Sequence, residues 1–115
     1  MKTKVTTKQL KNNFDIVLSV GYCDAQNLFK NLKPFGYNSG VYGWNFDAYE
    51  IPDTNICITT GYRPTGKSID YKFLQKYEKM MCSTGEKYGY FTPQRKVQET
   101  RIFNKFVKEL KEMYL

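Results

Sequence analysis

The chain has 115 residues, which is enough for one folded domain with a core of its own. Hydrophobic residues make up 41% of the chain and aromatic residues 17%, a composition that excludes a disordered tail. The net charge of +7 favours attraction to polyanions, and the lack of histidine excludes the commonest general base and the usual mixed zinc sites.

The first third of the chain predicts two helices. From Thr7, apolar residues recur at the spacing of a helical stripe, which predicts a helix that reaches Leu18 before Gly21 interrupts it. Asp24 can cap a second, short helix that ends at Lys33, because the following proline disfavours helical backbone in the residue before it. The apolar residues of this second helix are Ala25, Leu28, Phe29 and Leu32.

The middle of the chain predicts a β-hairpin over about residues 41–60. Residues 35–40 are turn-like, and from 41 to 51 apolar and polar residues alternate with the period of a strand that has one buried face. A turn at 52–55 then leads to an antiparallel partner at 56–60. The side chains expected on the buried face are Tyr42, Trp44, Phe46 and Ala48.

The last part of the chain predicts two further helices. The first begins at Ser68 or Ile69 and ends near Met81, and the second covers about residues 94–113 with a long apolar stripe. Residues 83–93 are predicted to form a loop or, at 88–91, a short third strand. The fold class is therefore α+β, a small antiparallel sheet covered on one face and packed against N-terminal and C-terminal helices.

The composition also bears on the compartment. No apolar run reaches the length of about 20 residues that spans a bilayer, and the Lys-rich start lacks the apolar stretch of a signal peptide. The cysteines, Cys23, Cys57 and Cys82, are odd in number and far apart, which favours reduced thiols. We expect a cytoplasmic single domain over residues 1–115 without membrane, metal or cofactor, in which residues 1–6 are disordered.

Residues 61–68, "GYRPTGKS", match the phosphate-loop pattern G-x-x-x-x-G-K-[ST]. In that reading Gly61, Gly66, Lys67 and Ser68 bind a nucleotide. The predicted hairpin opposes it, because such a loop works in a parallel sheet with a second strand that ends in Asp, and Pro64 removes one amide donor from the cradle. The preferred interpretation is two turns followed by Ser68 as the N-cap of a helix, with anion binding at that helix start as a third reading.

Two other groups of residues each allow two interpretations. The aromatic run from Tyr37 to Tyr49 is either core or a stacking platform for single-stranded nucleic acid. On the last helix Arg101, Lys105 and Lys108 form one stripe, which Glu109 and Glu112 dilute. It is either a solvated face or a nucleic-acid contact. The carboxylates of Asp47 and Glu50 are expected on opposite faces of a strand and so are poorly placed to share a substrate, and Asp53 is explained by the turn.

About half of the chain, roughly residues 8–66, resembles a known group of proteins. The motifs are G-Y-C-x-x-Q-x-L from Gly21, Y-N-x-G-V-Y-G-W-N-x-D-x-Y from Tyr37, and T-G-Y-R-P from Thr60. They resemble small uncharacterised proteins encoded on conjugative transposons and related mobile elements of Firmicutes, clostridia in particular. The resemblance implies a setting, an accessory protein of a mobile element, and it carries no activity or catalytic residue.

These observations lead to one main functional hypothesis and one alternative. The main hypothesis is a non-enzymatic accessory protein that binds a macromolecule, either a protein or a nucleic acid. Its proposed surface residues are Tyr37, Tyr42, Asn45, Asp47, Tyr62 and Arg63. The alternative is nucleotide binding or hydrolysis through the loop at 61–68.

Overall fold

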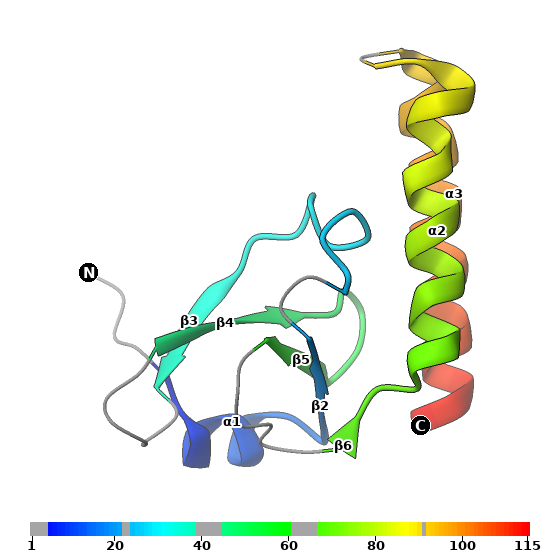
Figure 1. The fold of residues 1–115 in the computed structure, drawn as a ribbon. Coiled ribbons are helices and arrows are strands. Elements are labelled where there is room, and N and C mark those ends of the chain that lie inside the picture. Colours follow the sequence, from blue (N-terminus) through cyan, green and yellow to red (C-terminus); the bar gives the residue numbers. More distant parts are fainter. Residues whose placement is uncertain (1–4, 22–23, 39–44, 61–66, 91) are drawn as a thin grey trace.

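The structure is a computed structural model that describes residues 5–21, 24–38, 45–60, 67–90 and 92–115; for residues 5–8, 11, 37, 38 and 45 it describes the backbone alone. The fold is α+β. Two long helices, α2 (Tyr71–Tyr88) and α3 (Pro93–Tyr114), stand side by side against a mixed sheet (Figure 1). The end of α2 and the start of α3 extend past the sheet.

Six strands of the described residues form one sheet, in the order β1, β3, β4, β5, β2, β6. The strands β3, β4 and β5 pair antiparallel, whereas β1 pairs with β3, β2 with β5, and β6 with β2 in parallel. The sequence predicted a purely antiparallel sheet, and the three parallel pairs correct that prediction. The bounds are β1 Val5–Thr6, β2 Ile16–Val20, β3 Phe35–Asn38, β4 Asn45–Glu50, β5 Ile56–Thr60 and β6 Lys67–Ser68.

The predicted helix from Thr7 to Leu18 is wrong in its second half. The helix α1 (Thr7–Asn13) ends early, and strand β2 follows within the predicted helical stripe. Three of the five residues of β2 are β-branched, which favours extended backbone. The backbone amides of Asp15 and Ile16 both donate to the carbonyl of Asn55, 3.0 and 3.3 Å away, and so bind the start of β2 to the turn before β5.

The second predicted helix, after Asp24, is also corrected. Residues 24–31 form a series of turns and not an α-helix. One helical hydrogen bond is present, from the Phe29 amide to the Ala25 carbonyl (3.0 Å), and the Leu32 amide bonds the Phe29 carbonyl at 3.0 Å. The predicted apolar side chains do pack inward, because Ala25, Leu28 and Phe29 are buried. We call residues 24–32 the turn segment.

The predicted hairpin is confirmed in its described part. Strands β4 and β5 pair antiparallel with Tyr49 opposite Ile58, and Asp53 takes a positive φ of 60° in the turn between them. Ala48 is buried and Phe46 half-buried, as expected, while Tyr42 and Trp44 lie outside the described residues. The turn predicted at 35–40 is wrong for its first four residues, which form β3.

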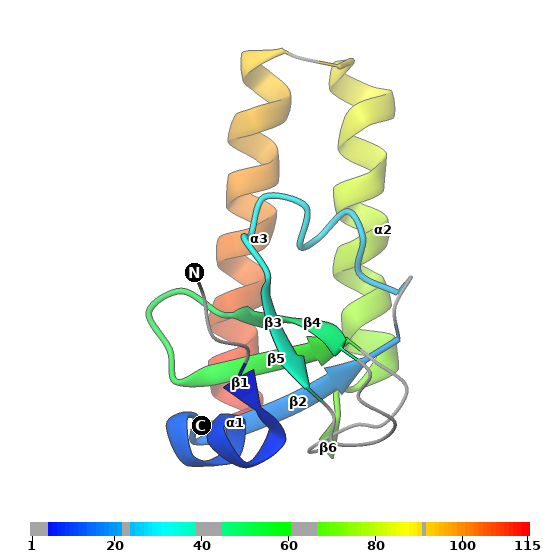
Figure 2. The same ribbon diagram turned by 90° about the vertical axis from the view of Figure 1, so that its left-hand side faces the viewer.

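Both faces of the sheet are covered. The sequence predicted that only one face would be covered, so this prediction is corrected. On one face Leu10 of α1 packs with Ala48 and Cys57. On the other, the apolar side chains of β2 and β5 pack with α2, α3 and the turn segment, and Figure 2 shows the two long helices behind the sheet with α1 in front. At the centre of this main core, the Phe106 ring contacts the rings of Phe29, Phe73, Tyr77 and Phe103.

The two long helices differ from the prediction mainly at their ends. Helix α2 begins after Asp70, whose carboxylate accepts from the Phe73 amide at 2.9 Å, so Ser68 is not its N-cap. It continues to Tyr88 and ends at Gly89 with φ 75°, so the strand predicted at 88–91 is wrong for the described residues there. Helix α3 is confirmed, although Val97 is 50% exposed and Glu99 takes a buried place instead.

In the described part of the chain, no helix combines the length and the apolar character that crossing a membrane requires.

Candidate functional site

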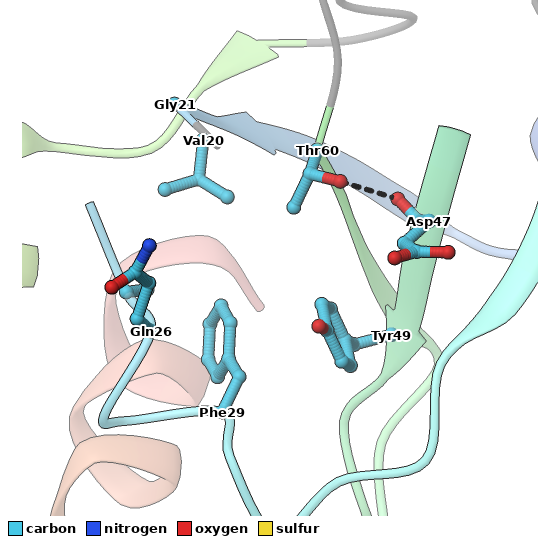
Figure 3. A pocket seen from close by; sticks show the side chains of 8 residues that line it. Val20, Gly21, Gln26, Phe29, Asp47, Tyr49 and Thr60 are labelled. Atoms are coloured by element: carbon cyan, nitrogen blue, oxygen red, sulfur yellow. Dashed lines mark hydrogen bonds between the residues drawn. The ribbon is translucent and has the colours of Figure 1, made fainter. Parts of the chain in front are cut away.

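A small pocket lies at the sheet edge where the parallel strands β2 and β5 end. Val20 of β2 pairs with Thr60 of β5, and β4 begins beside them because it runs the other way. The pocket has a volume of about 180 Å³, and Figure 3 shows the side chains around it. It is lined by Val20, Gly21, Ala25, Gln26, Phe29, Asp47, Tyr49 and Thr60.

The polar groups of this edge are carboxylates, hydroxyls and one amide. The Thr60 hydroxyl donates to the backbone carbonyl of Asp47 at 2.9 Å (Figure 3), and the Asp47 residue is exposed. A second hollow of about 280 Å³ on the other side of Val20 is lined by Asp24, Ser19 and Ser68, among others. The charged side chains among the described residues that line the two hollows are the carboxylates Asp47 and Asp24.

The residues of the phosphate-loop pattern do not form a strand, loop and helix in direct succession. Lys67 and Ser68 form the short strand β6, which pairs in parallel with Leu18 and Ser19 of β2. Helix α2 begins only at Tyr71. The pattern needs its Lys and Ser at the turn into the helix, where the backbone amides surround the phosphates. Gly61 and Gly66 lie outside the described residues.

The residues predicted for a recognition surface are only partly described. Asp47 is exposed on β4, as that hypothesis requires. The backbones of Tyr37 and Asn45 lie in the neighbouring strands β3 and β4. Tyr42, Tyr62 and Arg63 lie outside the described residues, so this surface stays a prediction.

The basic stripe predicted on α3 is exposed and has a counterpart on α2. Arg101, Lys105 and Lys108 are all exposed. Helix α2 carries three exposed lysines at the same spacing of four and then three residues, a signal the sequence contains but the prediction missed. These are Lys72, Lys76 and Lys79. Because successive helical residues turn by about 100°, each stripe lies opposite the side of its helix that is buried in the core.

Contacts between the two helices fix how these stripes align. The Phe73 and Tyr77 rings of α2 lie 5.3 and 5.6 Å from the Phe106 ring of α3, and the Arg95 guanidinium lies against Gly85. At the other end, the Tyr114 hydroxyl accepts from the Asp70 amide at 3.0 Å.

This antiparallel alignment places the six basic side chains in three pairs at successive levels. The pairs are Lys72 with Lys108, Lys76 with Lys105, and Lys79 with Arg101. We call these six side chains the basic face. Its side chains lie opposite the buried residues of α2 and α3, which pack in the main core with the apolar side chains of β2 and β5.

Two carboxylates of the same helices are engaged inside the molecule. Glu78 accepts from the amides of Asn27 and Leu28 at 3.1 and 2.8 Å, and from the Asn27 side-chain amide at 2.8 Å. Glu99 is only 8% exposed and pairs with Lys30 and, at 3.4 Å, with Arg95. Neither carboxylate is therefore placed to neutralise the basic face.

Two titratable groups in the interior, the Cys57 thiol and the Tyr77 hydroxyl, have raised pKa values. Burial, and then the nearby Glu50 carboxylate, raise the pKa of the Cys57 thiol to about 12, so the thiol is protonated and a poor nucleophile. Burial is the main cause that raises the pKa of the Tyr77 hydroxyl, and the carboxylates of Glu109 and Glu112 raise it further. Among the residues that the structure describes, no group of three or more Cys, Asp or Glu side chains is placed to hold a metal ion.

No protein-family model, no curated protein and no solved structure matches the chain.

Proposed function

We propose that the protein is a non-enzymatic accessory protein of a mobile genetic element that binds nucleic acid through the basic face of α2 and α3. The observation that carries this proposal is the pairing of six exposed basic side chains at three successive levels of one helical pair. Phosphates attract such a surface regardless of sequence, and the release of counterions supplies most of the binding free energy.

The chemistry of the face favours nucleic acid over a protein partner. The centre of a protein interface is typically depleted of lysine and enriched in aromatic residues. The basic face has five lysines and one arginine. The carboxylates of Glu78 and Glu99 are held inside the molecule, and the exposed carboxylates Glu86 and Glu112 stand beyond the ends of the two stripes, so the three levels between them carry basic side chains.

The setting in a mobile element rests on the resemblance of the Y-G-W-N-x-D and T-G-Y-R-P motifs. A nucleic-acid partner is compatible with that setting, since such elements are copied, cut and transferred as DNA. The proposal assigns no catalytic residue, and it predicts no nucleotide turnover.

The test measures binding of a fluorescent DNA of about 20 base pairs, roughly two helical turns, by anisotropy at low salt. The double variant Lys105→Gln/Lys108→Gln lowers the net charge from +7 to +5 and should weaken binding strongly. The matched control, Lys33→Gln/Lys67→Gln, removes the same charge from exposed positions outside the two helices and should bind nearly as the unmodified protein does.

Two results would contradict the proposal. One is the absence of binding to any DNA at low salt, and the other is an equal loss of affinity in both double variants, which would mean that net charge alone matters. Thermal unfolding of each variant checks that the fold is intact, which we expect because Gln is nearly as good a helix former as Lys.

A further inference from the structure

We infer that the basic face binds the phosphate backbone of a nucleic-acid duplex without reading its sequence. This inference rests on the proposed function and narrows the class of ligand. Three features of the face support it: the absence of exposed aromatic rings between its described side chains, its two rows and its composition.

The described parts of the helical pair offer no stacking platform between the basic side chains. Proteins that hold single strands interleave basic residues with aromatic rings on which the bases stack. The exposed rings nearest to the face, Tyr71 (54% exposed) and Tyr90 (73%), lie at the start of α2 and beyond its end. The Tyr90 ring is in addition covered by the Arg95 guanidinium, 4.9 Å from its centroid. A single strand on the basic face would therefore gain charge contacts and lose stacking.

The two rows of basic side chains, one on α2 and one on α3, match the two phosphate backbones of a duplex. From Lys72 to Lys79, and from Arg101 to Lys108, each row covers eight residues, which rise by about 10 Å along the helix. The axes of packed helices are about 8–10 Å apart, so the face is about as wide as it is long. One strand can follow only one row, whereas the two strands that border a groove of a duplex can each meet a row.

The composition of the face limits sequence readout. Five of its six side chains are lysines, which act as point charges, whereas specific contacts to base edges are most often made by the planar fork of arginine. The single Arg101 stands at one end of its row. Contacts of this kind position a protein on the backbone and do not select a sequence.

The experiment compares one labelled sequence of about 20 base pairs as a duplex and as a single strand, at salt concentrations from about 50 to 200 mM. Six neutralised phosphates predict a slope of log K against log salt of about −5 for the duplex. We expect the duplex to bind about tenfold more tightly than the single strand, because its charge density along the axis is twice as high. A duplex of shuffled sequence should bind equally well.

The double variant Lys105→Gln/Lys108→Gln should make the duplex slope shallower by about 2, and Lys33→Gln/Lys67→Gln should leave it unchanged. A single strand that binds as tightly as the duplex, or a strong preference for one duplex sequence, overturns this inference and leaves the proposed function standing. Failure to bind either form at low salt overturns both.

Discussion

Cys57 and Cys82 differ sharply as single residues. Cys57 is fully buried on β5 opposite Glu50, and its thiol has a pKa raised to about 12; Cys82 is exposed on α2. Because the thiolate is the nucleophile, we predict that iodoacetamide alkylates Cys82 in the folded protein and leaves Cys57 unmodified until the chain is unfolded. Peptide mapping by mass spectrometry at about pH 8 distinguishes the two sites. Rapid labelling of Cys57 in the native protein would show that β5 is not buried as described.

Gly89 is constrained by its backbone. It ends α2 with φ 75° and ψ 175°, a region that residues with a Cβ avoid, and its amide donates to the Gly85 carbonyl at 3.0 Å. We predict that Gly89→Ala lowers the free energy of unfolding by about 1–3 kcal/mol. Urea unfolding measures it, with Glu86→Gln on the same helix as a control that should change stability by less than about 0.5 kcal/mol. A variant as stable as the unmodified protein would refute this assignment of strain.

The sequence shows which residue types can cap a helix, but it does not show which of these residues does so. Asp24 and Ser68 were predicted as helix caps because their side chains can accept from backbone amides. Asp70 and Thr92 fill that role for the two long helices. Several residues of this type stand near each helix start, so the choice among them depends on where the strand before the helix ends, and that is fixed by pairing with distant residues.

At the scale of elements, Glu78 joins α2 to the turn segment. Its carboxylate accepts three hydrogen bonds from Asn27 and Leu28, about 50 residues away, and so completes turns that do not form a helix of their own. Hydrogen bonds to a charged group contribute about 1.5–3 kcal/mol, and we predict that Glu78→Ala lowers the free energy of unfolding by an amount in that range.

The readout for Glu78 is urea unfolding together with amide hydrogen exchange. Exchange at Asn27 and Leu28 should accelerate in Glu78→Ala, while exchange in β2 and β5 should follow global stability alone. Glu86→Ala, which removes an exposed carboxylate from the same helix, is the control. Unchanged exchange at both amides would show that the turn segment holds its conformation without this carboxylate.

The elements that the sequence predicted well have a local signal. The apolar stripes of α2 and α3 and the alternation in β4 each repeat within one element, so the buried residues Leu74, Tyr77 and Phe106 could be predicted. The strand β2 could not, because Val17 and Leu18 also continue the spacing of α1 and its partner β5 lies 40 residues later. The end of α2 was missed because its last residues, with Thr84 and Gly85, resemble a loop; both are buried against the rest of the fold.

At the scale of the molecule, the buried Cys57 thiol and Tyr77 hydroxyl should make the free energy of unfolding fall at alkaline pH. The pKa of Cys57 rises from its ordinary 9.0 to about 12, and that of Tyr77 rises from 10.0, both chiefly through burial. Above about pH 9 the unfolded chain releases these protons first, while the folded chain retains them. The free energy of unfolding should therefore fall as pH rises from about 9 toward 12, by up to about 1.4 kcal/mol per pH unit for each group.

Urea unfolding at about pH 8 and about pH 10 measures this loss, and Cys57→Ala should lose less between the two values because one of the two groups is gone. A stability that is constant over this range, or a variant that loses as much as the unmodified protein, would contradict the assignment.

The two stripes of the basic face could be predicted from the sequence, but their arrangement relative to each other could not. Each stripe could be recognised from its own spacing, and the one on α3 was predicted. Their alignment into three levels depends on which residues of α2 meet α3, and the engagement of Glu78 and Glu99 depends on the turn segment. The sequence shows ten basic and five acidic residues from 71 to 115, but it does not show which of the acids point inward.

The order of the strands in the sheet also determines how this chain can be assembled over time. Strand β2 precedes its partners β5 and β6 in the chain by roughly 40 and 50 residues, so its pairings are long-range. Helices α2 and α3 are neighbours in sequence and close on one another through short-range contacts, which form faster than long-range pairings. We expect pulse-labelled hydrogen exchange during refolding to protect amides of α2 and α3 before those of β2. The pair of helices would then fold before the sheet that precedes it in sequence, and it would provide the surface on which the strands gather.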